Sequence, residues 1–226
     1  MAHPQLDLTN DQLLSTTRAV RKRLDFDRPV SEDTLRECME VAVQAPTGSN
    51  AQGWQFVFVT DQAKKDRIGE LYAQVWSLYK EMPVAIHHLH KDSGDDSLKS
   101  SQDRSTSSAE YLAVNIAKAP VLLIPCIAGR SDGPDQPLGG NFSGAAAYGS
   151  IIPAAWNFML AARARGIGTA WTTLHLMHEK EVAELLGIPY DDYMQVALIP
   201  MAYTKGTDFK PAYRPPVETV MHIDQW

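Results

Sequence analysis

The chain has 226 residues and a mass of 25.0 kDa, with 44% hydrophobic residues, 21% charged residues and a formal net charge of −6. This composition is typical of a globular protein, and it excludes a mostly disordered chain, a collagen-like fibre and a disulfide scaffold. The acidic balance gives no general attraction to a nucleic-acid backbone or an anionic membrane, so we expect neither as a partner.

The sequence also indicates a cellular compartment. No segment approaches the ~18–20 unbroken apolar residues of a membrane helix, and the N-terminus lacks the pattern of a signal peptide. Cys38 and Cys126 lie far apart and show no metal-ligand spacing, so we interpret both as free buried thiols. These features predict a cytoplasmic protein.

Predicted helices and short buried strands alternate along the chain, which indicates an α/β or α+β architecture with helices covering a mixed sheet. In chain order we expect a helix capped by Ser31 and stopped by Pro46, a strand over 55–59, a helix with an apolar stripe over 68–79, a strand over 121–127, a long helix over 145–165, a strand over 168–172, a short helix over 179–186 and a strand over 193–202. The periodicity of the long helix fits an ordinary central helix and a dimer-core helix equally well.

Two polar stretches interrupt this alternation. Residues 87–108 are acidic and serine-rich, which predicts a mobile surface excursion rather than a domain boundary. Residues 129–143 are rich in turn formers and predict a loop. Because there is no repeat and no convincing linker, we expect one domain over residues 1–226.

Four segments carry possible chemistry, and each has an ordinary structural explanation as well. The run TTRAVRKR at 16–23 suits an anion site, but a solvated helix end also attracts basic residues. The segment APTGSNAQGW at 45–54 could hydrogen-bond the edge of a planar heterocycle, or it could be a plain turn. The strand end in GIGTAWTTLH at 166–175 could present backbone N–H groups to a ligand or simply cap a helix. Arg214 in YRPP could bind an anion or form a surface ion pair.

Other classes of site find less support. His87, His88 and His90 lie in a polar stretch without a paired HxxxH or a cysteine ligand, so we expect no metal site. The chain has no GxSxG nucleophile motif, no GxGxxG after a strand and no GxxxxGK[ST] loop. A serine hydrolase, a Rossmann dinucleotide site and a P-loop are therefore not predicted.

Taken in order, the four segments resemble the nitroreductase family of FMN-dependent oxidoreductases over about residues 11–226. The resemblance is carried by RAVR, APTGSNAQGWQFVFV, LAARARGIGTAWTTL and YRPPVETVMHIDQW. The residues of TTRAVRKR and APTGSNAQGW look most like an actinobacterial branch of the family. It implies a three-layer α+β fold with a central mixed, mainly antiparallel sheet covered by helices. It also implies an intertwined homodimer with FMN at the interface and a C-terminal arm, at about 205–226, that reaches across the partner.

The resemblance also implies residues for the FMN site. Arg18 and Arg21 match the basic residues that bind the phosphate and approach the pyrimidine side of the ring, and Arg214 matches the residue that completes the phosphate site. The remaining matched positions are Ala19 and Val20 between the two arginines; Pro46, Thr47, Gly48, Asn50 and Gln52 in a loop from the second subunit; and Thr172, Thr173 and Leu174 at the flavin's redox-active edge. Ala19 stands where many relatives have Ser, so any contact there has to come from the backbone.

The activity that the resemblance implies is a ping-pong transfer of hydride from NADH or NADPH through FMN to a small acceptor, such as a nitroaromatic, a quinone or an enone. The flavin performs the chemistry, so we expect no catalytic side chain and no metal. Two alternatives remain open. One is a protein that binds or sequesters flavin without NAD(P)H turnover, and the other is an oxygen-using flavoenzyme on the same fold.

Overall fold

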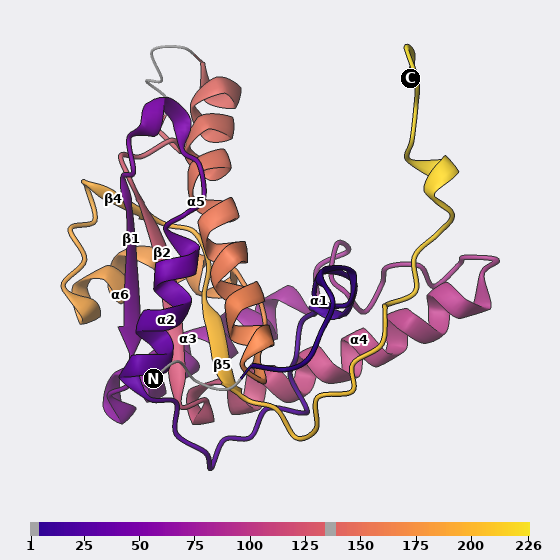
Figure 1. Cartoon of the computed structure of the whole chain (residues 1–226), viewed down its shortest axis with the longest axis horizontal. Coiled ribbons are helices and arrows are strands. Elements are labelled where there is room, and N and C mark those ends of the chain that lie inside the picture. The colour runs from indigo at the N-terminus through magenta and orange to yellow at the C-terminus, as the bar shows by residue number, and fades with distance from the viewer. Residues whose placement is uncertain (1–4, 134–138) are drawn as a thin grey trace.

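The computed structural model describes residues 5–133 and 139–226, and its centre is a five-stranded sheet (Figure 1). The strands are β1 (Trp54–Val59), β2 (Val121–Ala128), β3 (Ile167–Thr169), β4 (Tyr193–Gln195) and β5 (Ile199–Tyr203). They lie in the order β1-β2-β5-β3, with β4 also paired to β2, and all these strand pairs are antiparallel. Among the described residues, parallel pairing occurs only in isolated bridges, such as Ala19 with Thr169, so the sheet is antiparallel as mainly expected, and its strands do not form a mixed sheet.

Helices cover both faces of this sheet. They are α1 (Asn10–Thr16), α2 (Glu32–Ala42), α3 (Gln62–Tyr79), α4 (Asp96–Asn115), α5 (Gly140–Ala164) and α6 (Glu179–Leu186), with short 3₁₀ turns at Gly48–Asn50, Ile116–Lys118, Leu174–His178 and Val217–Thr219. Neighbouring residues of β2 point to opposite faces, as the two-residue period of a strand requires. Leu122 and Ile124 pack in a cluster with α3, α4 and α6, whereas Leu123 packs with α2 and α5. The predicted three-layer α+β fold is therefore confirmed.

The strand expected over 193–202 is two strands, β4 and β5, and Pro125 of β2 explains the break. β4 pairs with the Cys126–Ala128 end of β2, and β5 pairs with the Val121–Leu123 end. Pro125 lies between these ends and has no N–H to donate, so a continuous ladder is not available there. It still accepts a bond from the N–H of Val196 at 2.9 Å.

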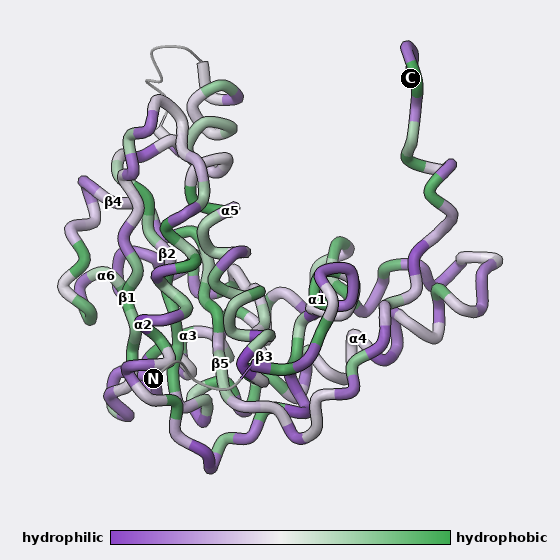
Figure 2. Tube along the Cα trace, in the orientation of Figure 1, coloured by the Kyte–Doolittle hydropathy of each residue, from purple (hydrophilic) through white to green (hydrophobic). Residues whose placement is uncertain are grey.

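The polar stretch 87–108 contains regular structure that its composition concealed. From residue 96 onward it belongs to α4, whose N-cap Asp95 accepts bonds from the N–H groups of Ser97 and Leu98 at 2.8 and 3.0 Å. The buried residues of α4 are Leu112 and Ala113, near its C-terminal end. The N-terminal half instead projects from the body of the molecule and is largely hydrophilic (Figures 1 and 2). Its mobility stays a prediction.

The long helix α5 differs from expectation in its apolar character. By length and composition it is apolar enough to cross a membrane, which the sequence analysis did not anticipate. However, Phe158 and Met159 are buried in one cluster with Leu35 of α2 and Ile167 of β3, as in the central helix of a globular core. Cys38 and Cys126 are also buried and unpaired, as predicted, and burial raises the pKa of their thiols to about 11 and about 12.

Candidate functional site

The basic segment, residues 16–23, begins at the last residue of α1 and lies against the end of β3. The N–H of Val20 donates to the carbonyl oxygen of Thr169 at 2.8 Å, and Ala19 forms a parallel bridge with the same residue. Val20 is buried over Gly168, where a Cβ would lie 2.8 Å from the Cβ of Val20. The valine therefore anchors the segment, while Arg18 stays exposed and Arg21 half-buried.

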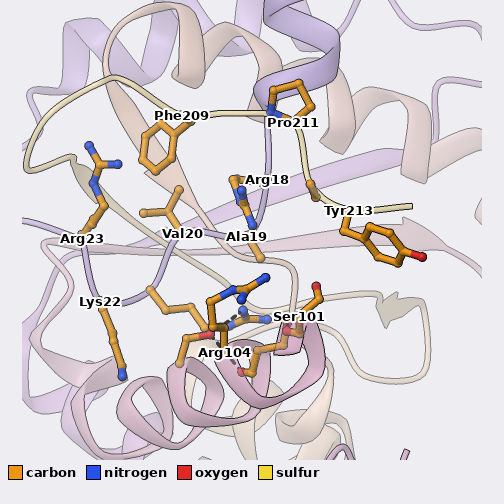
Figure 3. Close-up of a pocket in the computed structure, with 14 residues that line it drawn as sticks. Arg18, Ala19, Val20, Lys22, Arg23, Ser101, Arg104, Phe209, Pro211 and Tyr213 are labelled. Atoms are coloured by element: carbon orange, nitrogen blue, oxygen red, sulfur yellow. Dashed lines mark hydrogen bonds between the residues drawn. The ribbon is translucent and has the colours of Figure 1, made fainter. Parts of the chain in front are cut away.

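Two adjoining cavities share Arg18 and Arg21 in their walls. The first, of about 350 Å³, lies between the basic segment, α4 and the chain at 209–213, and Figure 3 shows Arg18, Lys22, Arg23 and Arg104 around it. The second lies between α1, α5 and the C-terminal chain, and its wall includes Arg214. Arg18, Ala19, Arg21 and Arg214 are thus brought together by the fold.

These cavities have a strong excess of positive charge. Arg23 pairs with Asp208 at 2.6 Å, but in the part of the chain that the structure describes Arg18, Arg21 and Arg214 form no ion pair. Arg18 donates to the carbonyl oxygen of Lys210 and Arg21 to the hydroxyl of Ser108, both at 3.1 Å. Burial lowers the pKa of Arg21, and the nearby Arg18 charge lowers it further. A bound anion would relieve both effects, so this geometry suits a phosphate.

Arg21 also lines a third cavity, which has aromatic walls. The other lining residues include Tyr72, Trp76, Trp171 and the predicted residues Thr172, Thr173 and Leu174. The N–H of Thr172 donates to Leu198 at 3.1 Å, whereas the N–H groups of Thr173 and Leu174 meet no acceptor among the described residues. An aromatic wall with free backbone donors suits a planar, polar ring, and Arg21 would lie between that ring and the phosphate region.

The loop at 45–52 is held by hydrogen bonds but lines none of these three cavities. The N–H of Gly48 donates to the hydroxyl of Ser150 on α5 at 3.1 Å, and the Thr47 hydroxyl accepts from the N–H of Gln52 at 3.1 Å. The amide of Gln52 donates to Asn50 at 3.0 Å, and both residues have positive φ. One chain alone therefore does not bring Pro46, Thr47, Gly48, Asn50 and Gln52 to Arg18 and Arg21.

Sequence reasoning missed the α4 side of the first cavity. Four residues of α4 line it, namely Ser101, Arg104, Ser105 and Ser108. Their spacing of i, i+3, i+4 and i+7 places them on one face of a helix. That spacing is visible in the sequence, but it carries a signal only once the stretch is known to be helical. Phe209 and Tyr213, also in this wall, reach it through a long-range arrangement of the C-terminal chain.

Comparison with known proteins gives consistent results. The profile described as the nitroreductase family matches residues 14–203. Among curated proteins, the chain is 32% identical over 80 residues to a Bacillus subtilis protein described as a putative NAD(P)H nitroreductase, in an alignment that covers 35% of this chain and 40% of that protein. The chain thus spans less than half the length of this relative.

Solved structures share the fold over nearly the whole chain. A BluB-like flavoprotein from Clostridium difficile 630 superposes with a TM-score of 0.69 at 18% identity, covering 96% of this chain and all of that one. An FMN- and NADPH-dependent nitroreductase from Sphigopyxis sp. strain HMH superposes with a TM-score of 0.67 at 19% identity, covering 97% and 100%. At these identities the likeness shows the fold. The sources of these relatives do not support the actinobacterial branch expected from the sequence.

Proposed function

Because the chain belongs to the nitroreductase family, we propose that it is an FMN-dependent oxidoreductase that takes electrons from NADH or NADPH. The observation that carries this proposal is the position of Arg21. Arg21 lines the two cation-lined cavities and also the aromatic cavity with free backbone donors. A ligand that carries a phosphate and a planar ring could therefore place the phosphate on one side of Arg21 and the ring on the other. When bound, FMN supplies the redox chemistry by accepting a hydride from NAD(P)H and passing it to an acceptor.

The phosphate of FMN would be held by Arg18 and Arg214, with Arg21 directed toward the pyrimidine side of the ring. These guanidiniums meet no carboxylate in the described residues, so their charge is available to a dianion. Each charge-assisted hydrogen bond contributes about 1.5–3 kcal/mol. Ala19 has no hydroxyl to offer and Val20 is buried, so both would contribute through their backbone only.

The redox-active edge would face the N–H groups of Thr173 and Leu174. Donors at this position stabilise negative charge as it develops on the reduced ring, because they are fixed in place before reduction. The N–H of Thr172 is bonded to Leu198, so its role would be to hold the segment that follows β3 in place beside β5. No side-chain acid or base is required by this arrangement, and we assign no catalytic residue.

A second copy of the chain would complete the site. One face of α5 carries a stripe of exposed residues at intervals of three and four positions. These residues are Phe142, Ala145, Gly149, Ile152 and Trp156. Such a stripe packs well against an equivalent helix, because its small residues allow close approach. The loop at 45–52 is attached to the same helix through Ser150 and would reach the flavin of the partner. The C-terminal chain, which extends away from the body, would wrap the partner (Figure 1).

The acceptor would be a small organic molecule, such as a nitroaromatic, a quinone or an enone, held against the aromatic cavity. Trp76 and Tyr79 line this cavity, and the ring of His87 lies 5.5 Å from that of Trp76. These residues belong to α3 and to the polar stretch that follows it. They are therefore in position to select the acceptor.

The test is the visible spectrum of the purified protein, followed without oxygen while NADPH and then NADH is added. A flavin spectrum that bleaches with either nucleotide supports the proposal. A flavin spectrum that does not bleach favours sequestration, or an oxygen-using reaction if oxygen uptake then depends on another substrate. A colourless protein that takes up no added FMN would overturn the proposal.

A further inference from the structure

The face of α4 that looks into the first cavity is built from hydroxyls and one guanidinium. Ser101, Ser105 and Ser108 line the cavity with Arg104, and Lys22 and Arg23 of the basic segment line it as well. Figure 3 shows Ser101, Arg104, Lys22 and Arg23 around it. The ammonium of Lys22 donates to Ser107 at 2.8 Å, and Arg21 donates to Ser108 at 3.1 Å. At this face, cations of the basic segment therefore meet hydroxyls of the helix.

The positive charge here exceeds what one phosphate needs. In addition to Arg18, Arg21 and Arg214, the wall of the first cavity contains Lys22 and Arg104. In the described parts of the chain these two residues form no ion pair, and Arg104 donates only to the hydroxyl of Ser100 at 2.5 Å. Cationic side chains that are each paired with a carboxylate need no further anion. Lys22 and Arg104 have no such partner, so their charges and those of the nearby arginines repel one another unless an anion is bound.

The extra cations lie on the side of the first cavity that the second cavity does not share, whereas Arg18 and Arg21 line both. Arg214 lines the second cavity and is absent from the first, whereas Lys22 and Arg104 line the first cavity and are absent from the second. Tyr213 keeps the C-terminal chain at the rim of the first cavity, because its hydroxyl donates to the carboxylate of Asp95, the N-cap of α4. The first cavity thus adjoins the flavin-phosphate region and forms a compartment whose additional cations, Lys22 and Arg104, are its own.

We propose that this compartment binds the 2′-phosphate of NADPH, so that the protein uses NADPH in preference to NADH. This inference rests on the proposed function, since it names the electron donor of that site. A 2′-phosphate is a dianion with three acceptor oxygens, which matches a lysine, an arginine and several serine hydroxyls. The adenosine of NADH has only a neutral hydroxyl at this position and gains nothing from the cations.

The kinetic test uses the flavin-loaded protein and the single variants Arg104→Ala and Lys22→Ala. Each is expected to lower kcat/KM for NADPH by roughly 10- to 100-fold, mainly through KM, and to change kcat/KM for NADH by less than about threefold. Lys91→Ala removes an exposed cation that lines neither cavity and is the matched control. Equal losses with both nucleotides, or no loss with either, would overturn the inference.

A binding measurement separates this inference from the proposed function. Adenosine 2′,5′-bisphosphate carries the 2′-phosphate without a nicotinamide, so calorimetric titration detects it without turnover. We expect the purified protein to bind it at least tenfold more tightly than 5′-AMP, and Arg104→Ala to remove this difference. If the protein bleaches with NADH but the two ligands bind alike, the inference fails and the proposed function stands. If no flavin binds, the proposed function fails by itself.

Discussion

The N–H of Val20 donates to the carbonyl oxygen of Thr169 at 2.8 Å, and this bond joins the basic segment to the strand that leads to the redox edge. Arg21 follows Val20 directly, and Thr172 follows Thr169 by three residues. The position of the cation-lined cavities relative to the aromatic cavity therefore depends on the contact between the basic segment and β3. Disturbing that contact should affect flavin binding without removing a single flavin-binding side chain.

Gly168→Ala tests this relationship. The added Cβ would lie 2.7 Å from Cγ2 of Thr204 and 2.8 Å from Cβ of Val20, so the basic segment has to shift. We expect the free energy of unfolding to fall by about 1–3 kcal/mol and FMN to dissociate more readily. Urea unfolding and flavin content after dialysis measure the two effects. Gly94→Ala is the control, because nothing lies within 4 Å of its Cβ, and equal behaviour of the two variants would contradict the prediction.

The phosphate assignment is tested by Arg214→Ala. Arg214 is exposed, lines the second cavity and forms no ion pair in the described residues, so its removal should change stability little. The loss of one charge-assisted contact should weaken FMN retention by roughly tenfold or more. Fluorescence of released flavin on dilution gives the dissociation constant. Full flavin occupancy in the variant, at dilutions where Lys91→Ala also stays loaded, would count against the assignment.

The arrangement of the core could be predicted from the sequence, because its elements have strong local signals. Apolar periodicity located α3, a long stretch rich in small residues before Gly166 located α5, and continuous apolar runs located β1 and β2. The break between β4 and β5 was missed because it depends on Pro125 of a strand far away in sequence. Helix α4 was missed because its exposed half has a polar face in place of an apolar stripe, and that face is where the unexpected half of the candidate site lies.

The exposed stripe on α5 gives a prediction about assembly. Ile152→Glu places a charge in the middle of that stripe, which is costly if the helix is buried against a partner. We expect dissociation to monomers and, because the 45–52 loop would then be lost from the site, a flavin content below about half of normal. Light scattering coupled to chromatography measures the mass. Val114→Glu is the matched control, since Val114 is 81% exposed on α4 and outside the stripe. A flavin-loaded monomer would refute the shared site.

The buried imidazole of His175 predicts how stability depends on pH. His175 lies in the 3₁₀ turn Leu174–His178, its side chain is fully buried, and neither ring nitrogen has a hydrogen-bond partner in the described residues. Burial lowers the pKa of His175 to about 3, against about 6.5 when unfolded, while Gln195 opposes the shift. The unfolded chain therefore takes up the proton first as the pH falls, so this contribution to stability is complete above pH 6.5 and decreases between pH 6.5 and about 3.

The substitution His175→Leu isolates this effect, because leucine has a similar volume and no titratable group. From pH 6.5 to 4.5 the free energy of unfolding of the wild type should fall by about 1 kcal/mol per pH unit more than that of the variant. At pH 7.5 the variant should be at least as stable, since an imidazole without partners contributes no hydrogen bond to lose. Urea titrations at four pH values measure both curves. Parallel curves would mean that the imidazole is hydrated or protonated in the folded protein, and that the backbone behind Thr173 and Leu174 is less well packed than the structure indicates.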